Sequence, residues 1–337
     1  MLERVPGRAS GIGSWPGTDP AESARTVFGE LPDPQVPYLP ELPARGPGAD
    51  LIGRGAALLV DLPVDLQPSG WRLVDRPGRD LGRAQSLLQQ DLDVLAEVAD
   101  GFRGPFKVPA AGPWTLAAWL HLARLDRVAA DPGACRDLVA SLAEGVARHV
   151  RRIRDLVPGA EVVVQLDEPS LTEVLGGRLP TASGFGRLRP VEEQVVVEGL
   201  RAVLEAARSA GALDTVVHCC AADAPIEVFV RAGAGAVSVD VSLLGVGGWE
   251  AVAAAVEGGV ALWAGVVPTT GPLLTAQAAA DRVWQPWRRM GLPGNGVHGV
   301  VVTPACGLAS LTPTAARAVL DRTRETANAL AEQGLQD

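Results

Sequence analysis

Eight short apolar runs, each followed by a stretch with helical periodicity, constrain this chain more than any other feature of its sequence. Apolar runs of four to eight residues suit buried parallel strands, and amphipathic stretches between them suit crossover helices. The first strand is expected to end within Gly11–Pro16. The other runs are Val36–Pro40, Phe106–Pro109, Glu161–Leu166, Thr215–Cys219, Ala236–Asp240, Val260–Val267 and Gly299–Pro304. Eight such units predict an α/β fold, a single (β/α)8 TIM barrel of about 250 residues plus insertions.

The remaining stretches complete this prediction. Helices are expected over 21–31, 81–99, 137–156, 191–210, 224–232, 249–256, 276–290 and 313–332. An irregular insertion containing Ala56–Pro63 follows the second strand. No linker, charge run or low-complexity segment marks a boundary, so residues 1–337 are expected to form one catalytic barrel. A doubly wound sheet is the alternative, but no G-x-G-x-x-G follows the first run.

Composition excludes several classes of function. The net charge is −9, and Lys107 is the only lysine, so the chain lacks the basic face expected of a nucleic-acid binder. The N-terminus lacks the apolar core of a signal peptide, and no apolar stretch approaches the roughly 20 residues needed to span a bilayer. We therefore expect a cytoplasmic protein with no membrane partner. The four cysteines are expected to be free thiols or metal ligands.

Polar side chains interrupt the ends of the apolar runs. They are Ser14, Asp167, Glu168, His218, Cys220, Asp240 and Cys306. In a TIM barrel the carboxyl ends of the strands meet at one rim, which carries the catalytic groups. An unpaired buried carboxylate would be costly there, so these groups need partners or a metal ion.

The sequence His-Cys-Cys at the end of the fifth run suggests a metal site. In an extended segment His218 and Cys220 project to the same side, whereas Cys219 points away. Zinc favours imidazole and thiolate ligands, so His218, Cys220 and Cys306 would supply three, with Asp240 as a displaceable fourth. A lone cysteine near a strand end is more often a packed core residue, but four candidates on three strands favour zinc.

Six motifs occur in a fixed order along nearly the whole chain. They are I-G-S-W-P (12–16), G-P-W-T-L-A-A-W (112–119), Q-L-D-E-P-S-L-T-E (165–173), V-H-C-C (217–220), V-S-V-D (237–240) and T-P-A-C-G-L (303–308). They resemble I-G-S-F-P, G-P-V-T-I-L-x-W, Q-x-D-E-P-A-L-R-E, H-x-C, I-x-I-E and N-P-D-C-G-L of the catalytic half of cobalamin-independent methionine synthases. That family lies within a wider superfamily of zinc thiol methyltransferases and uroporphyrinogen decarboxylase-like barrels.

The resemblance implies a zinc-dependent methyltransferase that acts on homocysteine and gives methionine. His218, Cys220 and Cys306 would hold Zn2+, with Asp240 where the family has glutamate. Asp167, expected to be a catalytic residue, would face the ammonium of homocysteine. The other residues implied to bind substrate are Ile12, Gly13, Ser14 and Glu41 at the amino-acid part, and Glu173 and Trp119 near the substrate and the folate ring.

Three departures from the family bear on the methyl donor. The family's full-length enzyme has a second, N-terminal barrel, for which 337 residues leave no room. The family's D-I-H-S-P segment after strand seven supplies a histidine as proton donor, whereas Ala264–Pro272 contains neither a histidine nor an acid. Asp240 is also one methylene shorter than glutamate. A methylfolate needs a proton to leave, so these departures favour a methyl-corrinoid, carried by a corrinoid protein, over methylfolate.

Two other classes of function remain open on the sequence. One is a different enzyme on the same barrel, either a thiol lyase or a uroporphyrinogen decarboxylase-like enzyme, the latter of which would need no zinc. The other is a non-catalytic binder of homocysteine or of a corrinoid partner protein, which the missing histidine allows.

Overall fold

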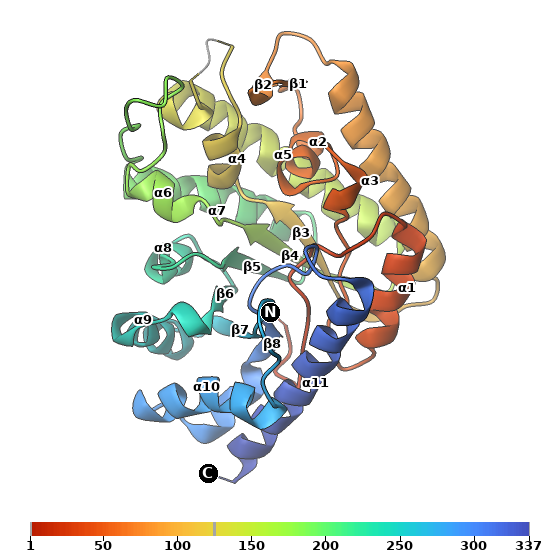
Figure 1. Ribbon diagram of the computed structural model, residues 1–337, viewed down its shortest axis with the longest axis vertical. Coiled ribbons are helices and arrows are strands. Elements are labelled where there is room, and N and C mark those ends of the chain that lie inside the picture. The colour runs from red at the N-terminus through yellow and green to blue at the C-terminus, as the bar shows by residue number, and fades with distance from the viewer. Residues whose placement is uncertain (1, 124–125, 337) are drawn as a thin grey trace.

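Six parallel strands form one curled sheet in the computed structural model, which describes residues 2–123 and 126–336 (Figure 1). In spatial order the strands are β3 (Gly104–Ala111), β4 (Ala160–Asp167), β5 (Asp214–Cys219), β6 (Ala236–Asp240), β7 (Ala261–Val267) and β8 (Val301–Pro304). Each strand pairs with the next one along the chain, and every pair is parallel. Such uninterrupted parallel order is the arrangement that strand–helix repeats generate.

Two irregular segments close the sheet into a ring. Ala9 bridges to Val302 of β8, Ser10 bridges to Val36, and Tyr38 bridges to Lys107 of β3. The predicted TIM barrel is thus confirmed, although its first two positions are isolated bridges where we expected strands. Prolines at 37 and 40 explain the second position, because proline has no N–H to donate to a ladder.

Helices surround the sheet, with α3 on the right of Figure 1, α8, α9 and α10 on the left, and α11 running down to the C-terminus at the bottom. Their bounds are α1 Pro20–Glu30, α2 Leu51–Leu58, α3 Arg79–Val98, α4 Pro113–Trp119, α5 Pro132–Leu156, α6 Leu171–Leu175, α7 Glu193–Ser209, α8 Ile226–Arg231, α9 Val246–Glu257, α10 Ala276–Arg289 and α11 Pro313–Leu335. Asp131 caps α5 and Thr312 caps α11, each just before a proline at the first helical position. Within residues 2–123 and 126–336, no helix is both long and apolar enough to cross a membrane.

The barrel interior changes character along its axis. Toward the amino-terminal ends of the strands it is filled by a small apolar cluster, formed by Val36, Val163, Val216, Ala236, Trp263 and Val301. The next inward-facing residues on β3, β4 and β5 are buried and polar: Lys107, Gln165 and His218. Buried polar groups require hydrogen-bond partners, so this part of the interior is built for contacts more specific than packing.

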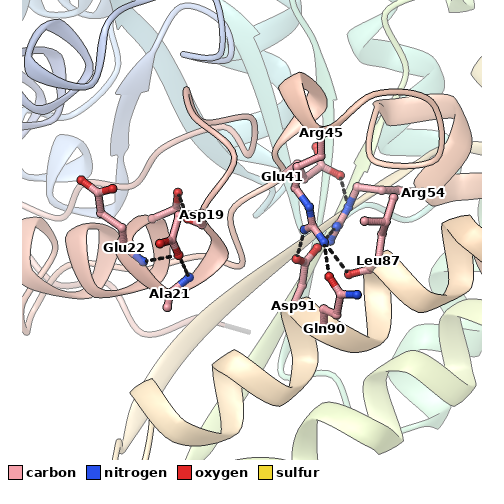
Figure 2. Close-up of polar contacts among 10 residues, drawn as sticks. Asp19, Ala21, Glu22, Glu41, Arg45, Arg54, Leu87, Gln90 and Asp91 are labelled. Carbon is pink, nitrogen blue, oxygen red and sulfur yellow. Dashed lines mark hydrogen bonds and ion pairs between the residues drawn. The ribbon is translucent and has the colours of Figure 1, made fainter.

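The predicted insertion after the second strand is present with its expected helix, but the part before that helix is not irregular. It contains α2, the antiparallel hairpin of β1 (Val64–Gln67) and β2 (Gly70–Leu73), and α3. A buried ion-pair network joins it to the barrel, and Figure 2 shows its members converging. Arg45 and Arg54 both bond Asp91 of α3, and Arg54 Nε lies 3.2 Å from Glu41 Oε1.

Replacing Arg54 by methionine is expected to lower the free energy of unfolding by about 3–5 kcal/mol. The change would leave the carboxylates of Glu41 and Asp91 buried without one of their cations. Urea unfolding of the purified variant measures the loss. The matched control is Arg25→Met, which breaks an exposed pair with Glu97 of the same α3 helix and should cost less than about 1 kcal/mol. Equal losses in both variants would contradict the role given to the buried pair.

Candidate active site

Two thiols from distant parts of the chain meet at the carboxyl-terminal rim of the barrel. Cys220 follows β5 and Cys306 follows β8, and their Sγ atoms lie 3.5 Å apart. Cys306 is exposed and Cys220 is partly exposed, whereas Cys135 and Cys219 are buried. The sequence prediction that Cys220 and Cys306 share a rim therefore holds in this geometry, and both sulfurs are accessible to a ligand.

The two thiols are within hydrogen-bonding distance of each other. Donation from Cys220 lowers the pKa of Cys306 to about 6, and the backbone N–H of Gly307 also favours its thiolate. The same hydrogen bond, followed by burial, raises the pKa of Cys220. Hydrogen bonding to a thiolate stabilises the charged form, so Cys306 is the thiol of the pair that ionises more readily.

His218, two residues before Cys220 in the sequence, supplies a neutral imidazole. It is buried, and that burial lowers its pKa to about 3. Its Nδ1 lies 3.0 Å from Ser238 Oγ on β6. A neutral ring whose Nδ1 is engaged leaves Nε2 as the nitrogen for a metal, with a neighbouring group orienting the ring as zinc sites require.

The donor set fits zinc in part. Two sulfurs on tetrahedral zinc lie roughly 3.7 Å apart when each bond is about 2.3 Å, close to the 3.5 Å between Cys220 and Cys306. Asp240, in contrast, forms a turn in which Oδ1 accepts from the Ser242 backbone at 2.9 Å and its hydroxyl at 2.6 Å. Across residues 2–123 and 126–336, no three potential ligands are grouped closely enough to hold a metal. Metal binding would therefore have to bring His218 or Asp240 toward the thiols.

One carboxyl group, Asp167, lies in electrostatic range of the thiol pair, and a second, Glu41, lies in range of Asp167. Asp167 ends β4, and Glu41 follows the second irregular segment; both are buried. Burial raises the pKa of each, and the charge of Glu41 raises the pKa of Asp167 further. The field of Asp167 also raises the pKa of Cys220. Glu41 already pairs with Arg54, whereas Asp167 forms no ion pair among the described residues, so a cation would relieve Asp167 and this end of the site suits an ammonium group.

The segment from Ile12 to Ser14 forms the wall between these groups. The Ser14 carbonyl accepts from Leu308 at 2.9 Å, and a Cβ atom on Gly307 would lie only 2.1 Å from Ser14 Oγ. Gly13 accepts from the Glu41 backbone, and a Cβ atom there would lie 3.3 Å from Glu41 Oε2. Glycine at 13 and 307 thus allows the first segment to approach both the Cys306 loop and Glu41.

Trp119 and Glu173 lie farther out on the rim. Trp119 is 53% exposed at the end of α4, where its Nε1 donates to Ser170 Oγ at 3.0 Å. The Arg127 guanidinium lies 5.7 Å from its ring centroid, and the exposed Glu173 supplies a negative field to that arginine. An accessible indole edged by a cation suits stacking against a flat ligand, whereas neither side chain hydrogen-bonds the thiols within the described parts of the chain.

Two buried residues of the site, Lys107 and Gln165, were not among the candidates from the sequence, and Glu168 was a candidate without an assigned role. Lys107 Nζ donates to Gly11 O, Ile12 O and Gln165 Oε1. Glu168 accepts from the backbone of Trp114 and Thr115 at the start of α4, and burial raises its pKa to about 7. A lone lysine within the apolar run of β3 was the available signal for Lys107, because lysine is almost never fully buried without partners.

Comparison with known proteins bears on this site. A family model described as "Cobalamin-independent synthase, Catalytic domain" matches residues 111–329. A B12-independent methionine synthase from Shewanella sp. W3-18-1, solved in complex with selenomethionine, is similar in fold. Its TM-score is 0.51 at 13% identity, over 73% of this chain and 68% of that chain. The carboxyl transferase domain of Rhizobium etli pyruvate carboxylase, with pyruvate, scores only 0.27 at 12% identity, over 70% of this chain and 44% of that chain. No curated protein sequence matches this chain at a significant level.

Proposed function

Because the chain belongs to the family of cobalamin-independent synthase catalytic domains, we propose that it is a zinc-dependent thiol methyltransferase that converts homocysteine to methionine. In this proposal residues 1–337 form one catalytic barrel. The observation that carries the proposal is the pair of accessible thiols, Cys220 and Cys306, 3.5 Å apart at the rim where barrel enzymes hold their catalytic groups.

The thiol pair and His218 are the residues that would hold zinc in this proposal, with Asp240 as a weaker candidate. The chemistry that zinc supplies when bound is a lower pKa for a coordinated substrate thiol, which then reacts as a thiolate at neutral pH. His218 is kept neutral by burial, as a ligand must be, and Ser238 orients its ring.

The amino-acid end of homocysteine would bind at the carboxyl pair. Asp167 and Glu41 would face the substrate ammonium, and that positive charge would lower the raised pKa of both carboxyl groups. The backbone from Ile12 to Ser14, which contacts the Cys306 loop, would set the distance between the ammonium and the sulfur. Holding both ends of the substrate orients the sulfur toward a methyl group for in-line attack.

The loop after β7 governs the choice of methyl donor in this proposal. Residues 264–272 offer hydroxyl groups at Thr269 and Thr270 but neither an acid nor a histidine. In the transfer, the homocysteine sulfur forms a bond to the methyl carbon, and the pair of electrons in the broken bond stays with the leaving group. A methyl-corrinoid accepts that pair without a proton, whereas a methylfolate nitrogen needs one.

We therefore expect methyl transfer to homocysteine from methylcobalamin to exceed transfer from methyltetrahydrofolate by about 100-fold or more, the usual contribution of a general acid. Methionine formation, measured by mass spectrometry with each donor in turn, provides the test. Protein stripped of metal with a chelator serves as the control and should be inactive with both donors. Faster transfer from the folate would show that another group protonates it. Failure with both donors would contradict the proposed activity.

A further inference from the structure

Among residues 2–123 and 126–336, Lys107 is the one fully buried basic side chain in the barrel interior, and it is the only lysine in the sequence. Its Nζ donates to the carbonyl oxygens of Gly11 at 2.6 Å and Ile12 at 2.5 Å, and to Gln165 Oε1 at 2.5 Å. An ammonium group has three N–H donors, so these three acceptors use all of them. Among the described residues no carboxylate lies within ion-pair distance of this nitrogen. Lys107 is therefore a structural donor and is not available to touch a ligand.

The three acceptors connect Lys107 to the proposed ammonium site. The carbonyls of Gly11 and Ile12 belong to the segment that leads to Ser14, and Gln165 lies two residues before Asp167 on β4. Gln165 Nε2 donates in turn to Ile12 O at 2.9 Å and to Asp167 Oδ1 at 2.7 Å. Lys107 thus contacts the segment that leads to Ser14 directly, and it contacts Asp167 through Gln165. Asp167 is the carboxyl group proposed to bind the amino-acid end of the substrate.

The lysine also decides which way the Gln165 amide points. Burial lowers the pKa of Lys107 to about 7, but its three acceptors call for the ammonium form, which can only donate, so the amide oxygen faces Lys107 and the NH2 group faces Ile12 and Asp167. Without that constraint the amide could turn and place its oxygen against the Asp167 carboxyl, where two acceptors would repel each other. In the observed arrangement Oδ1 receives a donor, and no residue in the described chain donates to Oδ2.

Aromatic rings hold the ammonium in place. Its nitrogen lies 5.3 Å from the Tyr38 ring centroid and 5.8 Å from that of Trp263. Both rings are buried, and cation–π contacts of this kind strengthen when water is excluded. The position of Lys107 is thus fixed by its surroundings, as a residue that orients others must be.

We propose that Lys107 is a positioning residue for the amino-acid end of the thiol substrate, acting through Gln165 to hold one oxygen of Asp167 and leave the other for the ammonium. This inference rests on the proposed function, because it assumes that the substrate is an α-amino acid thiol. It also limits the substrate class: a thiol without an ammonium group would gain nothing from the arrangement.

A double-mutant cycle on methionine binding tests the proposal. Lys107→Met and Gln165→Leu should each weaken methionine binding, measured by calorimetry, by roughly tenfold, as loss of one buried hydrogen bond would. The double variant should lose no more than either single variant, since both act on Asp167 by one route. Zinc content should stay unchanged. The matched control is Tyr38→Phe, which removes a hydroxyl beside Lys107 but keeps the ring, and should bind methionine normally.

The single lysine offers a readout that needs no variant. In protein labelled with 13C and 15N only at lysine, Lys107 gives one side-chain signal, and that signal should shift when methionine saturates the site. An unchanged signal at saturation, normal binding by Lys107→Met, or independent additive losses in the cycle would each overturn the role of Lys107 alone. Absence of methionine binding to the wild type would instead overturn the proposed function and this inference with it.

Discussion

Replacing Cys306 by serine is expected to remove zinc from the protein and to lower methyl transfer by more than about 100-fold. Even groups that only support a zinc ligand commonly contribute 10- to 100-fold, and Cys306 would be a ligand itself. It is also the thiol whose pKa lies near 6, so it is the readier of the pair to bind a metal as thiolate. Metal analysis of the purified variant and the rate of methionine formation are the two measurements.

Cys219→Ala is the control for the Cys306 experiment. Cys219 neighbours Cys220 in sequence but is buried in the hydrophobic core outside the barrel interior, and burial raises its pKa to about 12. It should cost some stability and leave zinc content near that of the wild type. If Cys306→Ser retained zinc while Cys219→Ala lost it, the proposed ligand set would be wrong.

Replacing Asp167 by asparagine is expected to raise the KM for homocysteine by at least about 30-fold. The substitution keeps the shape of the side chain but removes the charge proposed to face the ammonium, and truncating one member of a buried charge pair costs about 2–5 kcal/mol. The asparagine could still accept from Gln165, which bonds Oδ1 at 2.7 Å, so the fold around it should persist. Steady-state kinetics with varied homocysteine measures the change, and kcat should fall less than KM rises.

Glu168→Gln is the control for the Asp167 experiment. It separates an effect on substrate binding from an effect on local structure. Glu168 is the next residue and is equally buried, but both of its oxygens accept bonds from Trp114 and Thr115 at the start of α4. Its substitution should lower the unfolding temperature with little effect on KM. An unchanged KM in Asp167→Asn, or equal KM changes in both variants, would contradict the assignment of Asp167 to the ammonium.

The expected order of the strands was enough to predict which distant residues lie together in the candidate site. In a barrel of parallel strands the carboxyl ends meet at one rim, and that rule alone predicted that Cys220 and Cys306, 86 positions apart, would lie together. The eight helices expected from periodicity all exist, with α5 beginning several residues earlier than expected, at Pro132. That earlier start follows the Asp-Pro cap at 131–132, a signal that was present in the sequence.

Side-chain networks were harder to predict because they depend on register and on contacts between distant segments. The link from Lys107 to Gln165 requires the pairing of β3 with β4, which apolar runs do not specify. The Arg54–Asp91 pair joins the expected helix α3 to α2, which lies in a stretch that we expected to be irregular. The turn at Asp240 could have been anticipated, since an aspartate two residues before a serine often bonds that residue's backbone N–H.

The isolated bridges at the start of the barrel have a consequence for charge. In a regular strand the carbonyls of Gly11 and Ile12 would accept from a neighbouring strand, and their dipoles would lie in the wall. Because pairing lapses between Ser10 and Ser14, both oxygens accept from a buried ammonium instead. Two main-chain carbonyl groups thus bind a buried cation in the centre of the barrel. Among the described residues, Lys107 forms no ion pair with Asp167 or Glu41, the carboxyl groups proposed to bind the substrate.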